Sequence, residues 1–347
     1  MLRRLAPQGL ALLIGLISAT LAFLINMPLP WMLGSMVGVT IAAMSRVPFT
    51  APDRLRPIVV PVVGVMLGST VNADIFQKLG PWALTLLILP LVLICSATIS
   101  YVIYRRIGHY DRTTAFYSAM PGGLNEMLLL GSGAGGNERR IALAHAARVL
   151  LVIFMVAIVF GVFMGVRSDS GAASWTPLTA PSALDYALLL GCAVIGAPLA
   201  KQINLPAAPM FGPMILSGFV HLMGWTHVAP PTIFIIGAQI VVGTVIGCRF
   251  IGATLRDVGQ DLGLAALGTA LALTAAGLMA FIAITMIDMP LSQAFLAFAP
   301  GGLTEMSLMT LAIGQDVAFV TVAHLIRVTM VIAIAPMVFG LLVWKRG

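Results

Sequence analysis

The sequence predicts an all-α polytopic membrane protein made of two inverted repeats. Hydrophobic residues make up 60% of the 347 residues, charged residues only 9%, and the mean hydropathy is +1.04. A soluble domain carries about 25% charged residues, so this chain has too little polar surface to cover a water-facing globule. At about 20 residues per crossing, its length allows about ten to twelve membrane segments.

The net charge of +7 does not indicate a nucleic-acid partner, because Lys and Arg residues lie mostly in short loops between apolar runs, as the positive-inside rule predicts. Cys95, Cys192 and Cys248 lie inside apolar runs and are expected to be buried hydrophobes. The sequence contains no metal-ligand cluster, P-loop or nucleophile elbow. We therefore expect no enzyme activity and no cofactor, other than a coupling H+ or Na+.

A duplicated motif reveals the repeats. Residues 121–127 read PGGLNEM and residues 300–306 read PGGLTEM, at an offset of 179 (300 − 121). Internal repetition of this kind indicates two copies of one structural unit. The same offset relates four further pairs, which are His145 and His324, Arg148 and Arg327, Gly64 and Gly243, and Gly68 and Gly247.

Each repeat contains six apolar elements. In the first repeat, residues 1–165, they are expected over 6–25, 29–45, 57–72, 81–104, 113–131 and 139–165. In the second, residues 183–347, they are expected over 183–200, 205–224, 232–248, 261–286, 291–313 and 317–344. Residues 166–182 contain Ser, Asp, Pro and Thr and are the expected linker.

Loop charges predict the orientation in a bacterial inner membrane. Arg-rich loops place the N-terminus and the loops after the second and fourth elements in the cytoplasm, and the C-terminus follows. In the first half a basic loop follows the fourth element, whereas in the second half the basic loop follows the third. This shift by one element indicates that the two halves have opposite orientations in the membrane. Opposite orientations require an odd number of crossings per half. Because each half has six elements, one of them must enter and leave the membrane on the same side. The fifth element is the candidate for this re-entry, because both its flanks are basic in the first half and acidic in the second. The flanking residues are Arg105, Arg106, Arg112, Arg139 and Arg140, and then Asp288 and Asp316. A broken helix that crosses fully is the alternative.

The Pro-Gly-Gly segments are the first candidate binding elements. Proline removes a backbone donor and two glycines let the chain turn. Irregular backbone in a membrane is tolerated only where protein or a water-filled cavity covers it, and paired interruptions in two halves indicate a transport site. A packing kink is the structural alternative. The candidate residues are Pro121, Gly122, Gly123 and Asn125 in the first copy and Pro300, Gly301, Gly302 and Thr304 in the second.

Ionisable residues follow each interruption. Glu126 and Glu305 are expected to bind a proton or Na+, or to form a structural ion pair. The next element has His and Arg at i, i+3, as His145 with Arg148 and as His324 with Arg327, which places each pair on one helix face. We expect each Arg to meet a substrate anion or a Glu, and each His to act as a proton relay or as a packing hydrogen bond.

These motifs resemble the membrane AbrB family. The likeness includes the two Pro-Gly-Gly motifs and the AHxxRV pattern at Ala144–Val149 and Ala323–Val328, and it extends over nearly the whole chain. It implies a duplicated membrane protein, often labelled an ammonia monooxygenase, in a family linked to regulation of gene expression. A fainter likeness is to the cation/proton antiporter and bile-acid symporter group, in which a helix opens with Gly-Asp much as at Gly314-Gln315-Asp316. The broken helices of that group cross each other, which argues against re-entry.

The expected function is therefore ion-coupled secondary transport of a small organic anion, with the site near the membrane midplane. The alternative is a membrane-embedded regulator or sensor that affects gene expression through a partner. Expected partners are the lipid bilayer, a small and possibly anionic molecule, and a second copy in a homodimer.

Overall fold

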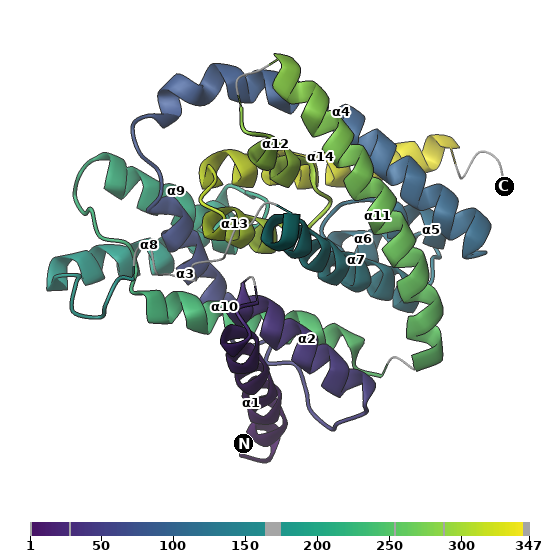
Figure 1. Ribbon diagram of the computed structural model, residues 1–347, viewed down its shortest axis with the longest axis horizontal. Helices are drawn as coiled ribbons and strands as arrows, with labels where there is room; N and C mark the ends of the chain where they lie inside the picture. The colour runs from purple at the N-terminus through teal and green to yellow at the C-terminus, as the bar shows by residue number, and fades with distance from the viewer. Residues whose placement is uncertain (1, 28, 164–174, 253–254, 287–288, 343–347) are drawn as a thin grey trace. The chain divides into compact units, whose positions relative to one another are not determined.

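The computed structural model describes residues 2–27, 29–163, 175–252, 255–286 and 289–342, and the regular structure in these ranges is entirely helical (Figure 1). The predicted all-α class is confirmed for this part of the chain. Residues 166–174 of the expected linker and the charged residues Asp288, Lys345 and Arg346 lie outside the described ranges.

Most of the twelve expected elements correspond to a single helix. In the first half the helices are α1 Leu2–Leu24, α2 Pro30–Met44, α3 Arg56–Gly68, α4 Ile75–Val102 with the π-helical turn η1 Ile103–Ile107, α5 Arg112–Ala119, α6 Leu124–Gly133, and α7 Glu138–Ile158 with η2 Val159–Phe163. In the second half they are α8 Ala183–Gln202, α9 Ala208–Leu222, α10 Thr232–Gly247 with the 3-10 turn η3 Cys248–Phe250, α11 Leu255–Met286, α12 Leu291–Phe298, α13 Leu303–Ala312 and α14 Val317–Leu342.

Seven helices of the described chain are long and apolar enough to cross a membrane, fewer than the ten to twelve that the length allows. They are α1, α4, α7, α8, α10, α11 and α14. The apolar helices α2, α3 and α9 have only 15, 13 and 15 residues. At about 1.5 Å per residue they extend roughly 20–23 Å, less than a hydrocarbon core of about 30 Å. The seven long helices are compatible with a multi-pass membrane protein.

The duplication is also visible in the backbone. Asn26 and Asn204 both have φ 54°, although few non-glycine residues adopt positive φ. Three positions later, Leu29 and Ala207 have φ 48° and 50° and precede α2 and α9. Both pairs share an offset of 178 (204 − 26 and 207 − 29). Matching sequence therefore produces the same unusual turn before two corresponding helices.

The helices group into two compact units, each of which takes helices from both halves of the chain. Unit 1 comprises 1–78, 157–252 and 307–318, and unit 2 comprises 79–156, 253–306 and 319–347. The predicted repeats, 1–165 and 183–347, describe duplication along the sequence rather than this division in space, and their boundaries stay a prediction.

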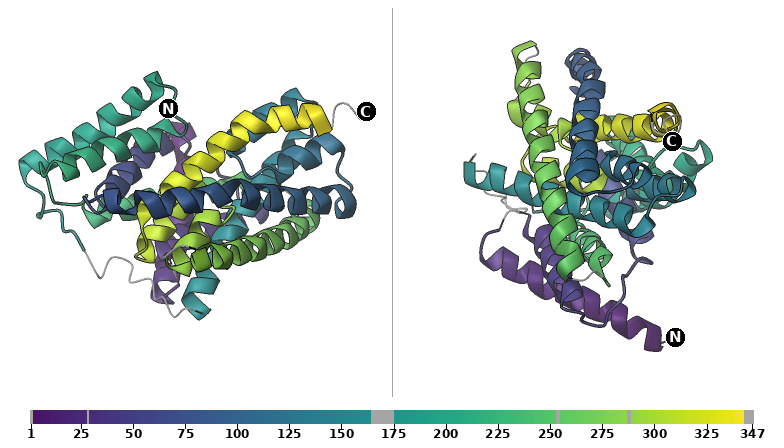
Figure 2. Two further views of the ribbon diagram at one scale, coloured as in Figure 1. Left: turned by 90° about the horizontal axis from the view of Figure 1, so that it is seen from above. Right: turned by 90° about the vertical axis from the view of Figure 1, so that its right-hand side faces the viewer.

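Helix packing in unit 1 follows one pattern twice. Helix α2 packs against α1 and α10, while α9 packs against α8 and α3; α8 and α9 lie side by side in Figure 2. A Cβ on Gly64 would meet the carbonyl oxygen of Met210, and one on Gly243 would meet that of Met32. These contacts are equivalent, because Met32 and Met210 are also related by the offset of 178 (210 − 32). The glycines thus allow close helix approach, which is the general role of small residues at helix interfaces in membranes.

We predict that Gly243→Ala lowers the free energy of unfolding by about 1–3 kcal/mol, because the new methyl group would overlap the backbone of α2. The matched control is Gly237→Ala on the same helix, where a Cβ meets nothing within 4 Å. The control should be neutral or mildly stabilising, because alanine favours the helix. Chemical unfolding in detergent would measure both, and equal stability of the two variants would contradict the packing assignment.

Candidate functional site

Both Pro-Gly-Gly segments interrupt helical structure. Helix α5 ends at Ala119 and α6 begins at Leu124, with Met120 and Gly123 in extended conformations. In the second copy α12 ends at Phe298, Ala299 is extended, and α13 begins at Leu303. Each proline lacks the amide hydrogen that could continue the helix. Residues 120–123 and 299–302 both belong to unit 2.

The first interrupted element folds back on itself. The backbone amide of Asn137, just after α6, donates to Thr114 Oγ1 near the start of α5 at 2.8 Å. A Cβ on Gly131 would lie 3.1 Å from the Cβ of Tyr117, and one on Gly136 would lie 3.2 Å from Thr113 Cγ2. The paired residue numbers add to nearly the same value, about 250 (114 + 137, 117 + 131 and 113 + 136), as expected for antiparallel segments. The start of α5 and the end of α6 are therefore neighbours.

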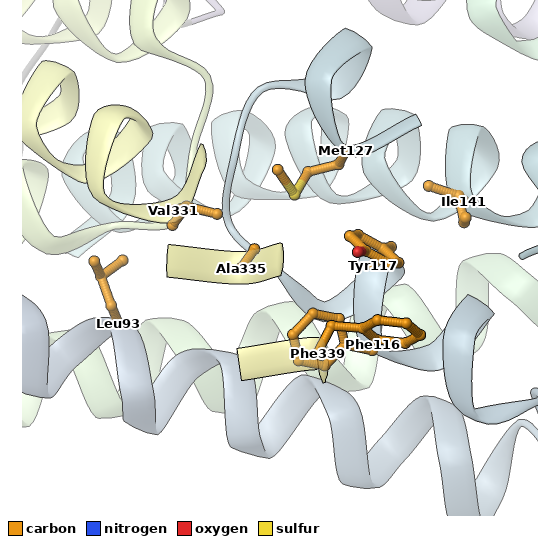
Figure 3. Close-up of a cluster of buried hydrophobic side chains, with 8 residues drawn as sticks. All are labelled: Leu93, Phe116, Tyr117, Met127, Ile141, Val331, Ala335 and Phe339. Atoms are coloured by element: carbon orange, nitrogen blue, oxygen red, sulfur yellow. The ribbon is translucent and has the colours of Figure 1, made fainter. Parts of the chain in front are cut away.

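A hydrophobic cluster fixes this folded element against α14 (Figure 3). The rings of Phe116 and Tyr117 from α5 lie 5.4 and 5.2 Å from the ring of Phe339 in α14. Met127 of α6 is fully buried in the same cluster. The cluster consists of Leu93, Phe116, Tyr117, Met127, Ile141, Val331, Ala335 and Phe339. The last helix of the second repeat thus supports the interrupted element of the first.

Each interruption contacts the last helix of the other repeat. A Cβ on Gly122 would lie 2.9 Å from Val331 Cγ1 in α14, and a Cβ on Gly301 would lie 3.2 Å from Val152 Cγ1 in α7. Val152 and Val331 are equivalent, because they are related by the offset of 179 (331 − 152). The glycines at each break therefore leave room for the neighbouring helix, α14 in the first copy and α7 in the second. Both breaks and both helix contacts belong to unit 2.

Arg148 is buried beside the end of α5. Its Nη1 donates to the carbonyl oxygens of Met120 at 3.0 Å and Ser118 at 3.5 Å, and its Nη2 lies 2.9 Å from His145 Nδ1. The side chain is only 7% exposed. Its positive charge thus lies at the C-terminal end of a short helix, where the partial charge is negative.

The hydrogen bonds of His145 define its tautomer. Nε2 lies 2.9 Å from the carbonyl oxygen of Tyr117, which can only accept, so Nε2 carries the hydrogen. Nδ1 then accepts from Arg148, which can only donate. The ring is therefore neutral in this arrangement. Of the two predicted roles, this geometry favours the packing hydrogen bond over the proton relay.

The second copy repeats this design with one difference. Arg327 donates through Nη1 to the carbonyl of Ala299 at 2.6 Å and through Nη2 to that of Gly301, while His324 Nε2 donates to Leu296 at 3.0 Å. However, His324 Nδ1 is buried and has no hydrogen-bond partner, so it does not hold the arginine as His145 does. The two arginines therefore occupy equivalent positions with different contacts.

Arg148 and Arg327 donate to backbone carbonyls, which are not among the partners that the sequence predicted for them. The cause is local, because the last carbonyls of α5 and α12 have no partner within their own helices. Buried carbonyls without partners are costly, and a nearby guanidinium satisfies two at once.

Glu126 and Glu305 lie in the first turns of α6 and α13. A Cβ on Gly123 would overlap the carboxylate of Glu126, and one on Gly302 would overlap that of Glu305, so each carboxylate folds back over its own helix start. This position suits a negative charge, because a helix N-terminus carries a positive partial charge. The copies differ in burial: Glu126 is exposed, whereas Glu305 is buried.

The remaining predicted residues line the same breaks. Pro121 and Pro300 are buried. Asn125 is exposed and Thr304 is half-buried, each next to the glutamate of its copy. Sequence reasoning missed the partners of the arginines, because they are main-chain carbonyls and main-chain atoms have no signature in a sequence.

The arginines have unused hydrogen-bonding capacity. A guanidinium has five N–H donors. The Nε atoms of Arg148 and Arg327 are buried and have no hydrogen-bond partner. Arg148 and Arg327 both belong to unit 2. Two buried positive charges with free donors can therefore bind an anion.

The described chain thus combines seven apolar helices of membrane-spanning length, which are compatible with a multi-pass membrane protein, with two buried arginines at helix interruptions. The sequence profile of the family described as "Transition state regulatory protein AbrB" matches residues 31–343, and the chain belongs to this family. This confirms the resemblance noted from the motifs.

Two relatives match over most of their length. The uncharacterized protein YhjN of Bacillus subtilis (strain 168) is 25% identical over 95% of this chain and 92% of its own. A protein of Escherichia coli (strain K12), named as a regulator AbrB, is 23% identical over 90% of this chain and 89% of its own.

We predict that His145→Gln destabilises the protein by about 1 kcal/mol more than His324→Gln. Glutamine can replace the donor at Nε2 in both copies but not the acceptor at Nδ1, which only His145 uses to hold an arginine. Thermal unfolding of the purified variants in detergent would test this difference. An equal or larger loss for His324→Gln would contradict it.

Proposed function

We propose that this protein is an ion-coupled secondary transporter of a small organic anion in the bacterial inner membrane. One observation carries the proposal: Arg148 and Arg327 are buried at two helix interruptions, and their Nε atoms have no hydrogen-bond partner. An intramembrane charge is costly and is rarely retained without a function. Helix interruptions in both halves are the expected place for a transport site.

The anion would bind the free N–H groups of the arginines. Main-chain carbonyls already accept part of their hydrogen bonds, but carbonyls carry no net charge to neutralise two cations. A carboxylate or similar anion supplies that charge, and guanidinium groups bind carboxylates with two parallel hydrogen bonds. Burial strengthens this attraction, because the surroundings have a low dielectric constant.

Glu126 and Glu305 are the candidates for the coupling ion, either H+ or Na+. Each carboxylate lies at the start of the helix that follows the interruption, close to the proposed anion site along the chain. Glu126 is exposed and Glu305 is buried, so the two positions differ in solvation. A site that exchanges an ion with water requires such access, and the exposed carboxylate supports that role in the first copy.

The fold-back of α5 and α6 supports a re-entrant hairpin. Helices of 8 and 10 residues extend about 12 and 15 Å, which is near half of a hydrocarbon core of about 30 Å. If the fifth element enters and leaves on one side, each half crosses five times and the repeats are inverted. Both termini are then cytoplasmic. The contacts of the first copy favour this hairpin over the crossed broken helices of the antiporter group.

The second candidate function is a membrane-embedded regulator that acts through a partner. The name of the family and of the E. coli relative favours it. The two functions differ at the arginines, because a regulator that acts only through protein contacts requires no buried cation pair. We favour transport for that reason and propose that the protein is not an enzyme and does not bind nucleic acid. A homodimer is compatible with either function.

We predict that small organic anions raise the melting temperature of the purified protein by a few degrees at saturating concentration. Arg148→Ala should abolish this shift, and Glu126→Gln should remove its dependence on pH or Na+. Arg46→Ala is the control, because Arg46 is exposed in unit 1 and should leave the shift unchanged. If no anion, proton concentration or Na+ alters the wild-type protein, the transporter proposal is wrong.

Topology gives a separate prediction. In a variant without Cys95, Cys192 and Cys248, single cysteines at the exposed positions Arg106 and Glu138 should react with an impermeant reagent from the same side of the membrane. These positions flank the fifth element, and a hairpin keeps both flanks on one side. Labelling from opposite sides would eliminate the re-entrant geometry in favour of a crossing helix.

A further inference from the structure

One end of unit 2 presents a strongly basic surface. Its five arginines come from η1, which follows α4, and from the starts of α5 and α7, and all five side chains are exposed. We refer to them as the basic patch: Arg105, Arg106, Arg112, Arg139 and Arg140. The described carboxylates nearby are Asp111, Glu138 and Asp261, so the net formal charge of this group of side chains is positive (5 − 3 = +2).

Tyr110 organises the basic patch. Its carbonyl oxygen accepts from Arg105 Nη1 at 2.8 Å, and the guanidinium carbon of Arg140 lies 4.8 Å from the centre of its ring. Its hydroxyl donates to Asp261 at 2.7 Å, and its ring stacks on Tyr104. Burial raises the pKa of Tyr110 far above its usual range, and the bond to Asp261 raises it further, so the hydroxyl remains a donor. Side chains from separate segments are thereby held together.

The carboxylate of Asp111 has a structural role beside the patch. Burial is the largest single influence and favours the neutral form, but the hydrogen bonds from Thr114, from Thr113 and from its own backbone together outweigh burial and lower the pKa of Asp111. It is therefore charged at neutral pH and caps the start of α5.

The second repeat forms the corresponding helices without these charges. The second repeat has no charged residue at any of the five equivalent positions, which are Ile284, Thr285, Leu291, Ala318 and Phe319. The residues equivalent to Tyr110 and Asp261 are Met289 and Trp82, at the same offset of 179 (289 − 110 and 261 − 82). There, Trp82 packs on Phe319 at 5.5 Å, an apolar contact. The same architecture is thus built once with a basic patch and once without.

The position of the patch indicates its ligand. Arg105 and Arg106 lie in the last turn of the candidate span Gln77–Ile107, and Arg140 lies in the first turn of the span Glu138–Gly161. Arginines at helix ends lie at the depth of lipid headgroups. Ile107 is 54% exposed beside them and offers a surface for an acyl chain. A charged headgroup and an apolar tail would both find a partner here.

We infer that the basic patch around Tyr110 binds the headgroup of an anionic phospholipid of the surrounding membrane. The phosphate would accept hydrogen bonds from the arginines that Tyr110 positions, and the acyl chain would lie along η1 at Ile107. Clusters of basic residues next to membrane helices are the usual basis of such recognition. The site lies at the membrane surface and is separate from the buried arginines of the proposed transport site.

The test uses the full-length protein in nanodiscs of phosphatidylcholine, with increasing fractions of phosphatidylglycerol. The wild type should bind phosphatidylglycerol preferentially, measured by native mass spectrometry of retained lipid. Arg105→Gln with Arg140→Gln should weaken this binding about 25-fold, since each arginine near an anionic surface contributes roughly a factor of five. Arg105→Lys with Arg140→Lys should keep most of it. The lysine variant also shows whether any loss comes from misfolding.

The control is Arg46→Gln with Arg54→Gln, which removes the same charge from an exposed loop of unit 1. It should leave retained phosphatidylglycerol unchanged. An equal loss in this control would overturn the inference in favour of general attraction to a charged membrane. Saturation by inorganic phosphate in place of lipid would overturn it in favour of a free-anion site. Unchanged lipid binding in the glutamine variant would show that the patch only sets topology.

Discussion

A helix that stops inside an apolar environment leaves main-chain carbonyls without partners, and this protein meets that requirement with arginine. Arg148 donates to Ser118 and Met120 at the end of α5, and Arg327 donates to Ala299 and Gly301 after α12. Each guanidinium also lies where the helix dipole is negative. The glycines, the histidines and the last helix of each repeat are arranged around this interaction.

The same electrostatic logic extends to the other side of each interruption. Glu126 and Glu305 lie where α6 and α13 begin, and the glycine before each leaves room for the carboxylate. Each interrupted element thus has a cation at the end of its first helix and an anion at the start of its second. Burial of a charge is tolerable only when partners compensate it. Because the arginines keep unused donors after these contacts, they can bind a further ligand.

Duplication serves as an internal control on which features the fold requires. Glycine contacts in unit 1 recur at equivalent positions, so close helix packing belongs to the common architecture. Other features occur in one copy only. His145 holds an arginine whereas His324 does not, Glu305 is buried whereas Glu126 is exposed, and the arginines around Tyr110 have uncharged counterparts. Because the common fold does not account for features found in one copy only, we explain those features by function.

The sequence by itself determined the helical class, the membrane environment and the location of nearly all helices, because hydrophobic runs and Pro-Gly-Gly interruptions are local signals. It also identified His145, Arg148 and their counterparts through a repeated spacing. Only the tertiary structure decided that Arg148 meets carbonyls rather than Glu126, that α6 returns along α5, and that the packing units interleave the two halves. These features depend on distances between segments far apart in the chain and on main-chain atoms, which residue types do not encode.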